Sequence, residues 1–195
     1  MNDYISDFES IVTSIYGVYQ NSKAGYRLLI KEITDYQETQ LNNLRRTNPQ
    51  SASIEFLDST PALYCEGNPN LPGANVLYEC SQGEYKKRNS EQGINAQFIG
   101  NMCIIAIYQY WEDHFRTKIA RHLRRKREDV LSDIMGDLRL LRNSIFHHRG
   151  IAQREIEDCI LLQWFHVGDD IYIDEEKFKE IISQVKSYIH TLRQS

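Results

Sequence analysis

The sequence predicts a mostly α-helical protein. Apolar side chains recur three and four residues apart in segments near both ends of the chain, which places them on one face of a helix. All four prolines lie between residues 47 and 100, so helix breakers of this kind are confined to one central stretch. Hydrophobic residues make up 41% and charged residues 26% of the 195 residues, a composition typical of a folded globular protein.

Residues 1–46 are expected to form an N-terminal helical segment that packs on a helical bundle. Its apolar positions are Ile5, Phe8, Ile11, Val12, Ile15, Val18, Tyr19, Leu28, Leu29, Ile33, Tyr36, Leu41 and Leu44. Gly17 and Gly25 weaken this pattern because glycine is a poor helix former. One long helix and two helices joined near Asn21–Gly25 both fit the sequence.

Residues 47–96 are interpreted as an irregular insertion rich in proline and glycine. Ser53–Leu57 and Val76–Cys80 are candidates for short strands, and the run GNPNLPGAN between them is predicted to be a loop of turns. An irregular stretch of this length usually serves binding or oligomerisation or is mobile, and the alternative is a passive surface excursion.

Residues 97–195 are expected to form a helical core. The stretch from Asn95 to Asp129 reads as one long helix with an apolar, buried first half and a basic second half. A second helix is predicted over residues 130–148, and Arg149–Gly150 supplies its C-terminal stop. Its apolar seam, at intervals of three and four, is Leu131, Ile134, Leu138, Leu141 and Ile145.

Two further elements are predicted after residue 150. The run ILLQWFHVGDDIYID, residues 160–174, fits a small β-hairpin around its Gly-Asp-Asp turn. Asp174 is expected to cap a final helix that has Glu175 and Glu176 in its first turn. The apolar face of that helix is Phe178, Ile181, Ile182, Val185, Tyr188, Ile189 and Leu192.

Charge and cysteine usage limit the possible functions and locations. The net charge of −4 gives no general attraction to nucleic acid, so such binding needs a local cluster of basic side chains. The four cysteines are too widely spaced for a Cys-x-x-Cys motif and are expected to be reduced thiols. The N-terminal residues are acidic, and no apolar run approaches the ~18 residues of a membrane span. We expect a cytoplasmic protein without membrane association, and no motif implies a metal or another cofactor.

The run LRLLRNSIFHHRG contains the groups that RNA cleavage by the substrate's own 2′-hydroxyl requires. A histidine with an ordinary pKa near ~6.5 can act as base or acid at neutral pH, and arginine donors match phosphate oxygens. We therefore predict that His147 is the general base or acid and that Arg142 stabilises the transition state. Asn143 is the predicted positioning residue, and His148 is a weaker candidate for the role of His147.

Helix geometry places a condition on this site. On a regular helix Asn143 and His147 share a face, whereas Arg142 and His147 point about 140° apart. Their side chains would converge through a distorted helix end, through the reach of the arginine, or through a two-fold dimer. The alternative is that both side chains only neutralise the helix dipole and bond free carbonyls.

The run Arg142-Asn143-Ser144-Ile145-Phe146-His147 resembles the Arg-x4–6-His motif, often with Asn after the Arg, of the HEPN superfamily. The preceding YQYWEDHFR resembles the Trp/Glu-bearing segment of prokaryotic members, and the likeness covers about residues 97–193. It implies a small helical bundle, and in many members a metal-independent endoribonuclease of toxin–antitoxin, phage-defence or RNA-processing systems. It also implies a site built at a dimer interface, with Arg142 and His147 as the catalytic pair and Asn143 as the accessory residue.

A basic run before the motif is a candidate RNA-binding surface. Its seven cations, with no acidic residue among them, are Arg116, Lys118, Arg121, Arg124, Arg125, Lys126 and Arg127. The alternative is the solvated end of a long helix. Glu112 is a possible accessory residue that either orders the catalytic arginine or pairs with Arg116 one helical turn away.

The leading functional prediction is a metal-independent endoribonuclease of the HEPN type. Its expected partners are RNA, such as tRNA or mRNA, a second copy of the chain that completes the site, and an antitoxin or other regulatory protein. The alternative is a non-catalytic HEPN-like module that binds a nucleotide or a partner protein. A third interpretation is a purely structural dimer.

Overall fold

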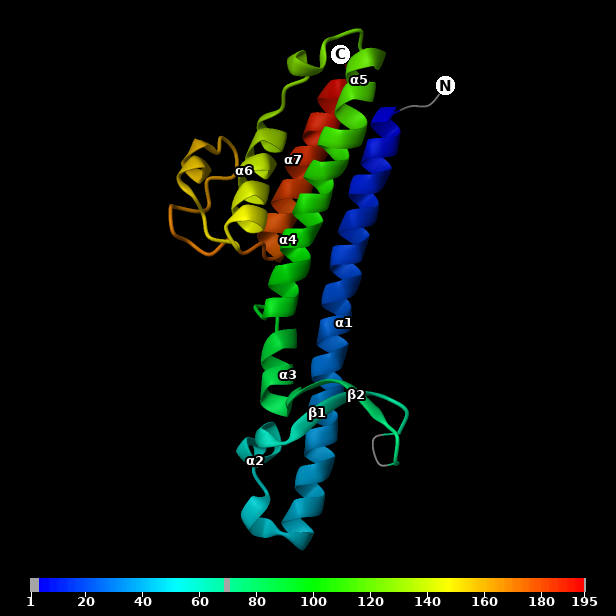
Figure 1. The fold of residues 1–195 in the computed structure, drawn as a ribbon, viewed down its shortest axis with the longest axis vertical. Coiled ribbons are helices and arrows are strands. Elements are labelled where there is room, and N and C mark those ends of the chain that lie inside the picture. The colour runs from blue at the N-terminus through cyan, green and yellow to red at the C-terminus, as the bar shows by residue number, and fades with distance from the viewer. Residues whose placement is uncertain (1–3, 69–70, 195) are drawn as a thin grey trace. The chain divides into compact units, whose positions relative to one another are not determined.

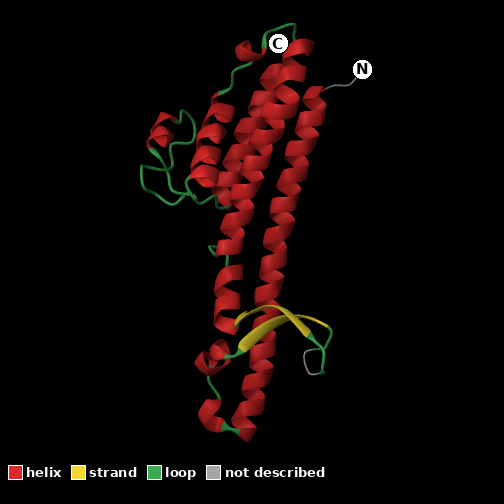
Figure 2. Cartoon of the chain, in the orientation of Figure 1, coloured by secondary structure: helices red, strands yellow, loops and turns green. Residues whose placement is uncertain are grey.

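The computed structural model describes residues 4–68 and 71–194, and within these ranges the chain is mostly helical, as predicted (Figures 1 and 2). The chain divides into two compact units. Unit 1 comprises Met1–Asn21 and Gln97–Ser195, and unit 2 comprises Ser22–Ala96.

The N-terminal segment is one uninterrupted helix, α1 (Tyr4–Thr47). Of the two arrangements that fitted the sequence, the single helix is the one observed. Its first part carries Ile5, Phe8, Val12 and Tyr19 into the core of unit 1.

Unit 1 is a helical bundle. The first part of α1 lies alongside α4 (Ile94–Gln109), α5 (Arg116–His122) and α7 (Glu175–Arg193), as Figure 1 shows. The six residues that join α4 to α5 form a π-helix, η2 (Tyr110–Phe115), and α6 (Asp133–His147) completes the bundle. Side chains from all of these helices share one apolar core.

The long helix predicted for residues 95–129 ends earlier, at His122. Arg124 has a φ of 54°, in the left-handed region that cannot continue a right-handed helix. The chain then passes through a short 3₁₀ turn, η3 (Arg127–Asp129), before α6. The cations from Arg124 to Arg127 therefore lie on a connection between helices.

The prediction that the apolar first half of this helix is buried is wrong for part of its surface. Ile104 and Ile107 are fully buried, but Phe98 is 62% and Tyr110 45% exposed. The helix is apolar on all sides, and the rest of the described chain covers only part of its circumference. An apolar helix face of this kind is typical of an interaction surface.

α7 agrees with its predicted start and α6 with its predicted stop, whereas α6 begins at Asp133, three residues later than predicted. The side chain of Ser132 accepts a hydrogen bond from Met135 N at 3.4 Å, and that of Asp174 accepts one from Lys177 N at 2.9 Å. Arg149 and Gly150 follow α6 with φ values of 56° and 85°, so the chain turns away in the left-handed conformation. Four of the five predicted seam residues of α6 are buried, and Leu131 is exposed before the helix begins.

The β-hairpin predicted for residues 160–174 is absent from this described segment. A 3₁₀ helix, η4 (Arg154–Asp158), precedes the segment, and Asp170 forms only an isolated bridge with Ile151. The buried carboxylate of Asp137 accepts hydrogen bonds from the backbone nitrogens of residues 160, 161 and 162 at 2.9, 2.7 and 2.8 Å. These donors serve a carboxylate, so they are not available to a strand ladder.

Unit 2 contains the sheet of the described chain. Strands β1 (Pro61–Glu66) and β2 (Asn75–Ser81) pair as an antiparallel hairpin, so the predicted strand at Val76–Cys80 is confirmed. Gly67 and Gly73, at the two sides of the predicted turn-rich loop, have positive φ, whereas Pro69 and Asn70 of that loop lie outside the described residues.

The remaining elements of the central segment are helical. The candidate strand at Ser53–Leu57 is instead α2 (Ile54–Ser59), because the Ser53 hydroxyl accepts a hydrogen bond from Phe56 N and caps a helix. The other elements are the 3₁₀ turn η1 (Pro49–Ser51) and α3 (Gln82–Asn89). The central segment is therefore less irregular than its composition predicts.

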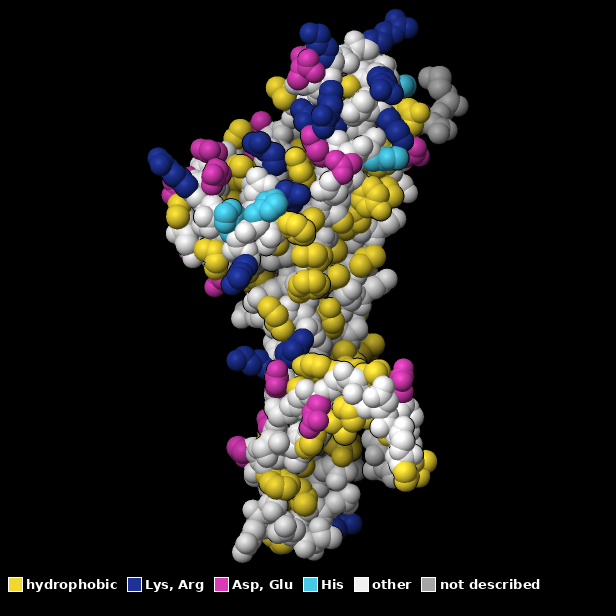
Figure 3. Space-filling view, in the orientation of Figure 1, with side chains coloured by type: hydrophobic (Ala, Val, Ile, Leu, Met, Phe, Trp, Pro, Cys, Tyr) yellow, Lys and Arg dark blue, Asp and Glu magenta, His cyan; other side chains and the backbone are white. Residues whose placement is uncertain are grey.

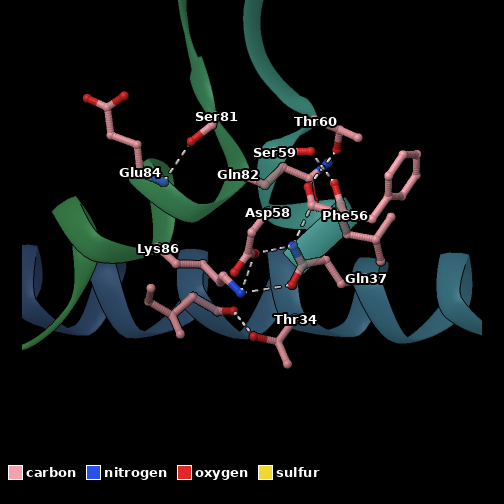
Figure 4. Close-up of polar contacts among 12 residues, drawn as sticks. Thr34, Gln37, Phe56, Asp58, Ser59, Thr60, Ser81, Gln82, Glu84 and Lys86 are labelled. Atoms are coloured by element: carbon pink, nitrogen blue, oxygen red, sulfur yellow. Dashed lines mark hydrogen bonds and ion pairs between the residues drawn. The ribbon is translucent and has the colours of Figure 1, made fainter. Parts of the chain in front are cut away.

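A buried polar cluster connects α1, α2 and α3 within unit 2 (Figure 4). The Gln37 amide donates to Asp58 at 2.8 Å and to Gln82 at 2.9 Å, and it accepts from Lys86 at 3.0 Å. Burial raises the pKa of Asp58, but hydrogen bonds from Lys86 and Gln37 and the charge of Lys86 outweigh it and hold this pKa below its usual range.

Candidate functional site

Arg142, Asn143 and His147 converge at the C-terminal end of α6. One guanidinium nitrogen, Arg142 Nη1, lies 3.1 Å from Asn143 Oδ1 and 3.0 Å from His147 Nε2. The helix is regular through His147, so the long arginine side chain itself spans the angle between the two positions. Of the three routes to convergence, the reach of the arginine is the one observed, and it needs no second chain.

The contact with Arg142 involves the Nε2 atom of His147. An arginine side chain only donates hydrogen bonds, so Nε2 is the acceptor in this contact. The lone pair on Nε2 is the group that a general base uses, and here it is occupied by Arg142.

Phe146 completes the immediate surroundings of the site. The guanidinium carbon of Arg142 lies 5.5 Å from the Phe146 ring centre, and the His147 ring meets the Phe146 ring edge-on at 5.5 Å. Phe146 and His147 are exposed to solvent. Arg142 Nε is buried without a hydrogen-bond partner, so the stem of the arginine is enclosed while Nη1 meets the polar groups.

The capping interpretation receives no support from the side-chain contacts. Within residues 4–68 and 71–194, the hydrogen bonds of the Arg142 and His147 side chains link them to each other and to Asn143, not to free carbonyls of α6. His148 is the C-cap residue, and its backbone nitrogen donates to Ser144 O at 3.1 Å. Its exposed side chain makes no hydrogen bond with the motif residues.

Glu112 does not bond to the motif arginine. Its carboxylate pairs with Arg116 at 3.0 Å and with Arg127, and Arg116 also donates to Val130 O at 3.1 Å. Of the two roles considered for Glu112, the structure therefore shows pairing with Arg116. This contact also ties the connection before α6 to η2.

The seven cations of the basic run fall into two groups. Arg116 and Arg127 are held by Glu112, and Lys118 lies 2.9 Å from His114 Nε2. The other four are exposed and form no ion pair within the described part of the chain; they are Arg121, Arg124, Arg125 and Lys126. They lie at the end of α5 and on the connection after it.

Sequence reasoning missed Tyr108, which faces the site from α4. Burial raises the pKa of the Tyr108 phenol, Glu112 raises it further, and Arg139, Arg116 and Arg142 lower it. The phenol thus lies within the electrostatic reach of the motif arginine and of the Glu112 cluster. The available signal was its position four residues before Glu112, on the same face of a predicted helix.

Apolar and basic side chains lie near the motif on one face of unit 1. Figure 3 shows hydrophobic side chains over α4 next to the histidines, with basic groups nearby. Phe98 of α4, Tyr110 of η2 and Phe146 of α6 are exposed, Phe146 to 64%. This face therefore carries histidine and basic side chains together with exposed apolar side chains.

Among the described residues, no group of three or more histidine, cysteine or acidic side chains is arranged to hold a metal ion. None of the described helices has the length and apolar character needed to cross a bilayer.

Comparisons with protein-family models, with curated proteins and with solved structures find no match for this chain.

Proposed function

We propose that this protein is a metal-independent endoribonuclease whose active site is formed by Arg142, Asn143 and His147. The observation that carries the proposal is the position of Arg142 Nη1, within hydrogen-bond distance of both partner side chains at an exposed helix end. A cation, an amide and an imidazole are thereby placed where one phosphodiester can contact all three.

The hydrogen bond between Arg142 and His147 suggests the order of events. A bound phosphate offers the guanidinium two anionic oxygens, a stronger partner than a neutral imidazole. Arg142 turns to the phosphate, and His147 Nε2 is released to take the proton of the 2′-hydroxyl. The 2′-oxygen attacks phosphorus, the bond to the 5′-oxygen breaks, and an acid protonates the leaving oxygen. The products are a 2′,3′-cyclic phosphate and a 5′-hydroxyl.

Resemblance to the HEPN superfamily supports the same assignment. The Arg142–His147 run matches the spacing of the family motif and lies at the end of a helix in a bundle. By this analogy we propose a cytoplasmic toxin–antitoxin or phage-defence protein, with an antitoxin or another regulatory protein as a partner. The alternative within the same family is a non-catalytic module that binds a nucleotide or a partner protein.

A homodimer is part of the proposal. The exposed face of α4 and the exposed Phe146 ring form an uncovered apolar surface beside the motif. Burying this surface against a second copy would bring two motifs together, and the second His147 would then be placed to protonate the leaving oxygen. Sedimentation of the full chain tests the dimer directly.

The four exposed cations at the end of α5 are proposed to bind the RNA backbone. Neutralising Arg124 and Arg125 together should weaken RNA binding and flatten its dependence on salt, because each lost phosphate contact lowers the slope of log K by ~0.7 for single strands. Neutralising Arg127 in addition also removes a partner of Glu112. An unchanged slope in both variants contradicts the proposed RNA surface.

The deciding experiment is sequencing of RNA 5′ ends after expression of the wild type and of His147→Ala in cells. The wild type should create new ends and inhibit growth, and His147→Ala should fold normally but lose both effects. His166→Ala, an exposed histidine outside the motif, is the matched control and should behave as wild type. Intact total RNA and tRNA with purified wild type, together with unchanged toxicity in Arg142→Ala and His147→Ala, would overturn the proposal.

A further inference from the structure

A polar cavity of about 300 Å³ lies between the α4–η2 junction and the N-terminal half of α6. Its size is at the lower end of the range of ~300–1,000 Å³ for small-molecule sites. Side chains from both walls enter it, among them Tyr108, Glu112 and Arg116 from one side and Ser132 and Arg139 from the other. All of these residues belong to unit 1.

One face of α6 connects this cavity to the motif. Ser132, Gly136 and Arg139 line the cavity, and a further three or four residues along the helix bring the same face to Arg142 and Asn143. Tyr108, on the opposite side of the cavity, supports this connection between cavity and motif, because its phenol interacts electrostatically with both arginines of α6, Arg139 and Arg142. A ligand in the cavity would therefore reach the motif without crossing another element.

We infer that this cavity binds the nucleotide next to the cleaved bond of an RNA substrate, with Arg139 contacting its phosphate and Tyr108 contacting its base or ribose. The inference rests on the proposed function for the position of the cleaved bond. It adds a binding site and two residues that the motif does not contain.

The charges of the cavity favour an anionic ligand at Arg139. Within the described ranges Arg139 forms no ion pair, and it is exposed. Glu112 is the acidic side chain of the cavity, and its carboxylate is occupied by Arg116 and Arg127. The positive charge of Arg139 thus remains available to a phosphate, one helical turn from Arg142.

The shape of the cavity also allows a test that changes no charge. A Cβ atom added to Gly136 would meet no heavy atom within 4 Å, so a larger side chain there has room to enter the cavity. Gly136→Leu should fill part of it, while Gly17→Leu makes the same change at an equally open helical position in α1.

The experiment measures binding of a fluorescently labelled single-stranded RNA tetranucleotide to the full-length chain carrying His147→Ala, which prevents cleavage. Adding Arg139→Ala should weaken binding at least ~10-fold, the effect of one lost charged contact. Adding Gly136→Leu should also weaken binding, because the leucine side chain occupies space that the nucleotide needs. Arg139→Ala should also flatten the salt dependence, and Arg139→Lys should restore most of it. Gly17→Leu and Arg154→Ala, an exposed arginine of η4, should change nothing.

The result separates this inference from the proposed function. In the cleavage-competent chain, Arg139→Ala should raise KM more than it lowers kcat, as expected for a binding contact. Cleavage by the wild type with unchanged binding and KM in both cavity variants would overturn the cavity inference alone. Loss of binding in these variants without any cleavage by the wild type would retain an RNA site and overturn the nuclease.

Discussion

At the scale of single residues, the two hydrogen bonds of Arg142 determine what can replace it. Lysine carries the same charge, but as a compact ammonium without the planar fork that matches phosphate oxygens. We expect Arg142→Lys to lower the single-turnover cleavage rate at least ~10-fold, because one oriented donor at a developing charge is lost. Arg154→Lys, at an exposed position of η4, is the control and should retain the full rate. Full activity of Arg142→Lys would mean that charge alone is sufficient.

Asp137 is the residue on which the segment after α6 depends. Its buried carboxylate accepts three backbone hydrogen bonds from residues 160–162. Asp137→Ala should lower the free energy of unfolding by ~2–4 kcal/mol, because three backbone donors lose their carboxylate acceptor. Urea unfolding measures the loss.

Two variants serve as references for Asp137→Ala. Asp137→Asn keeps one acceptor oxygen and should have an intermediate effect. Asp133→Ala, at an exposed position in the first turn of the same helix, should cost less than ~1 kcal/mol. Equal unfolding midpoints for Asp133→Ala and Asp137→Ala would show that the three hydrogen bonds do not stabilise the fold.

At the scale of elements, two glycines in helices should respond oppositely to the same substitution. A Cβ atom at Gly100 of α4 would lie 2.5 Å from Ile173 O, so Gly100→Ala forces backbone apart and should cost ~1–3 kcal/mol. A Cβ atom at Gly136 of α6 would meet open space, and Gly136→Ala should stabilise the helix by ~0.5–1 kcal/mol. Thermal unfolding compares the two, and a loss of stability in both would show that the space at Gly136 is not open.

The success of sequence prediction also differs between elements. α7 follows from its apolar spacing and its cap at Asp174, and α6 follows from its apolar spacing and the stop at Arg149–Gly150, which are local signals. The π-helix η2 does not, because its pattern differs from an α-helix by a single shift in register. The missing hairpin at residues 160–174 depends on Asp137, a partner more than twenty residues away. Contacts between residues so far apart in the sequence produce no local sequence pattern from which they could be predicted.

The candidate site shows the same division. The residue types of the motif and its place at a helix end can be predicted from the sequence, and the structure agrees with both. The contact between Arg142 and His147 cannot be predicted in this way, because a regular helix separates the two positions by about 140°. Only the rotamer of the arginine side chain brings the two groups together. Tyr108 and Arg139 lie outside the motif and join its surroundings through packing of α4 against α6.

At the scale of the whole molecule, the cysteines can report how the two units unfold. Burial raises the pKa of Cys103 to about 11 and that of Cys159 to about 12, and Asp137 and Asp158 contribute to the second shift. The folded protein therefore favours protonated thiols. This contribution to stability is complete below the ordinary thiol pKa of 9.0 and is lost as the pH rises through these folded values.

Alkylation followed by mass spectrometry tests this expectation. At pH 8 the half-buried Cys65 of unit 2 should react first, and Cys103 and Cys159 of unit 1 should react only as urea unfolds the protein. Native reaction of Cys103 at the rate of Cys65 would contradict the burial of this thiol. Labelling at increasing urea would also show whether the two units lose structure together.

The backbone of Arg124 has a consequence for engineering this chain. An arginine with a φ of 54° carries a conformational cost of ~1–2 kcal/mol that asparagine would largely avoid. Arg124→Asn is therefore a substitution that selection for heat resistance alone would favour. On the proposed function, the same substitution removes a cation from the RNA surface, so a variant optimised for stability at this position would be a weaker binder of its substrate.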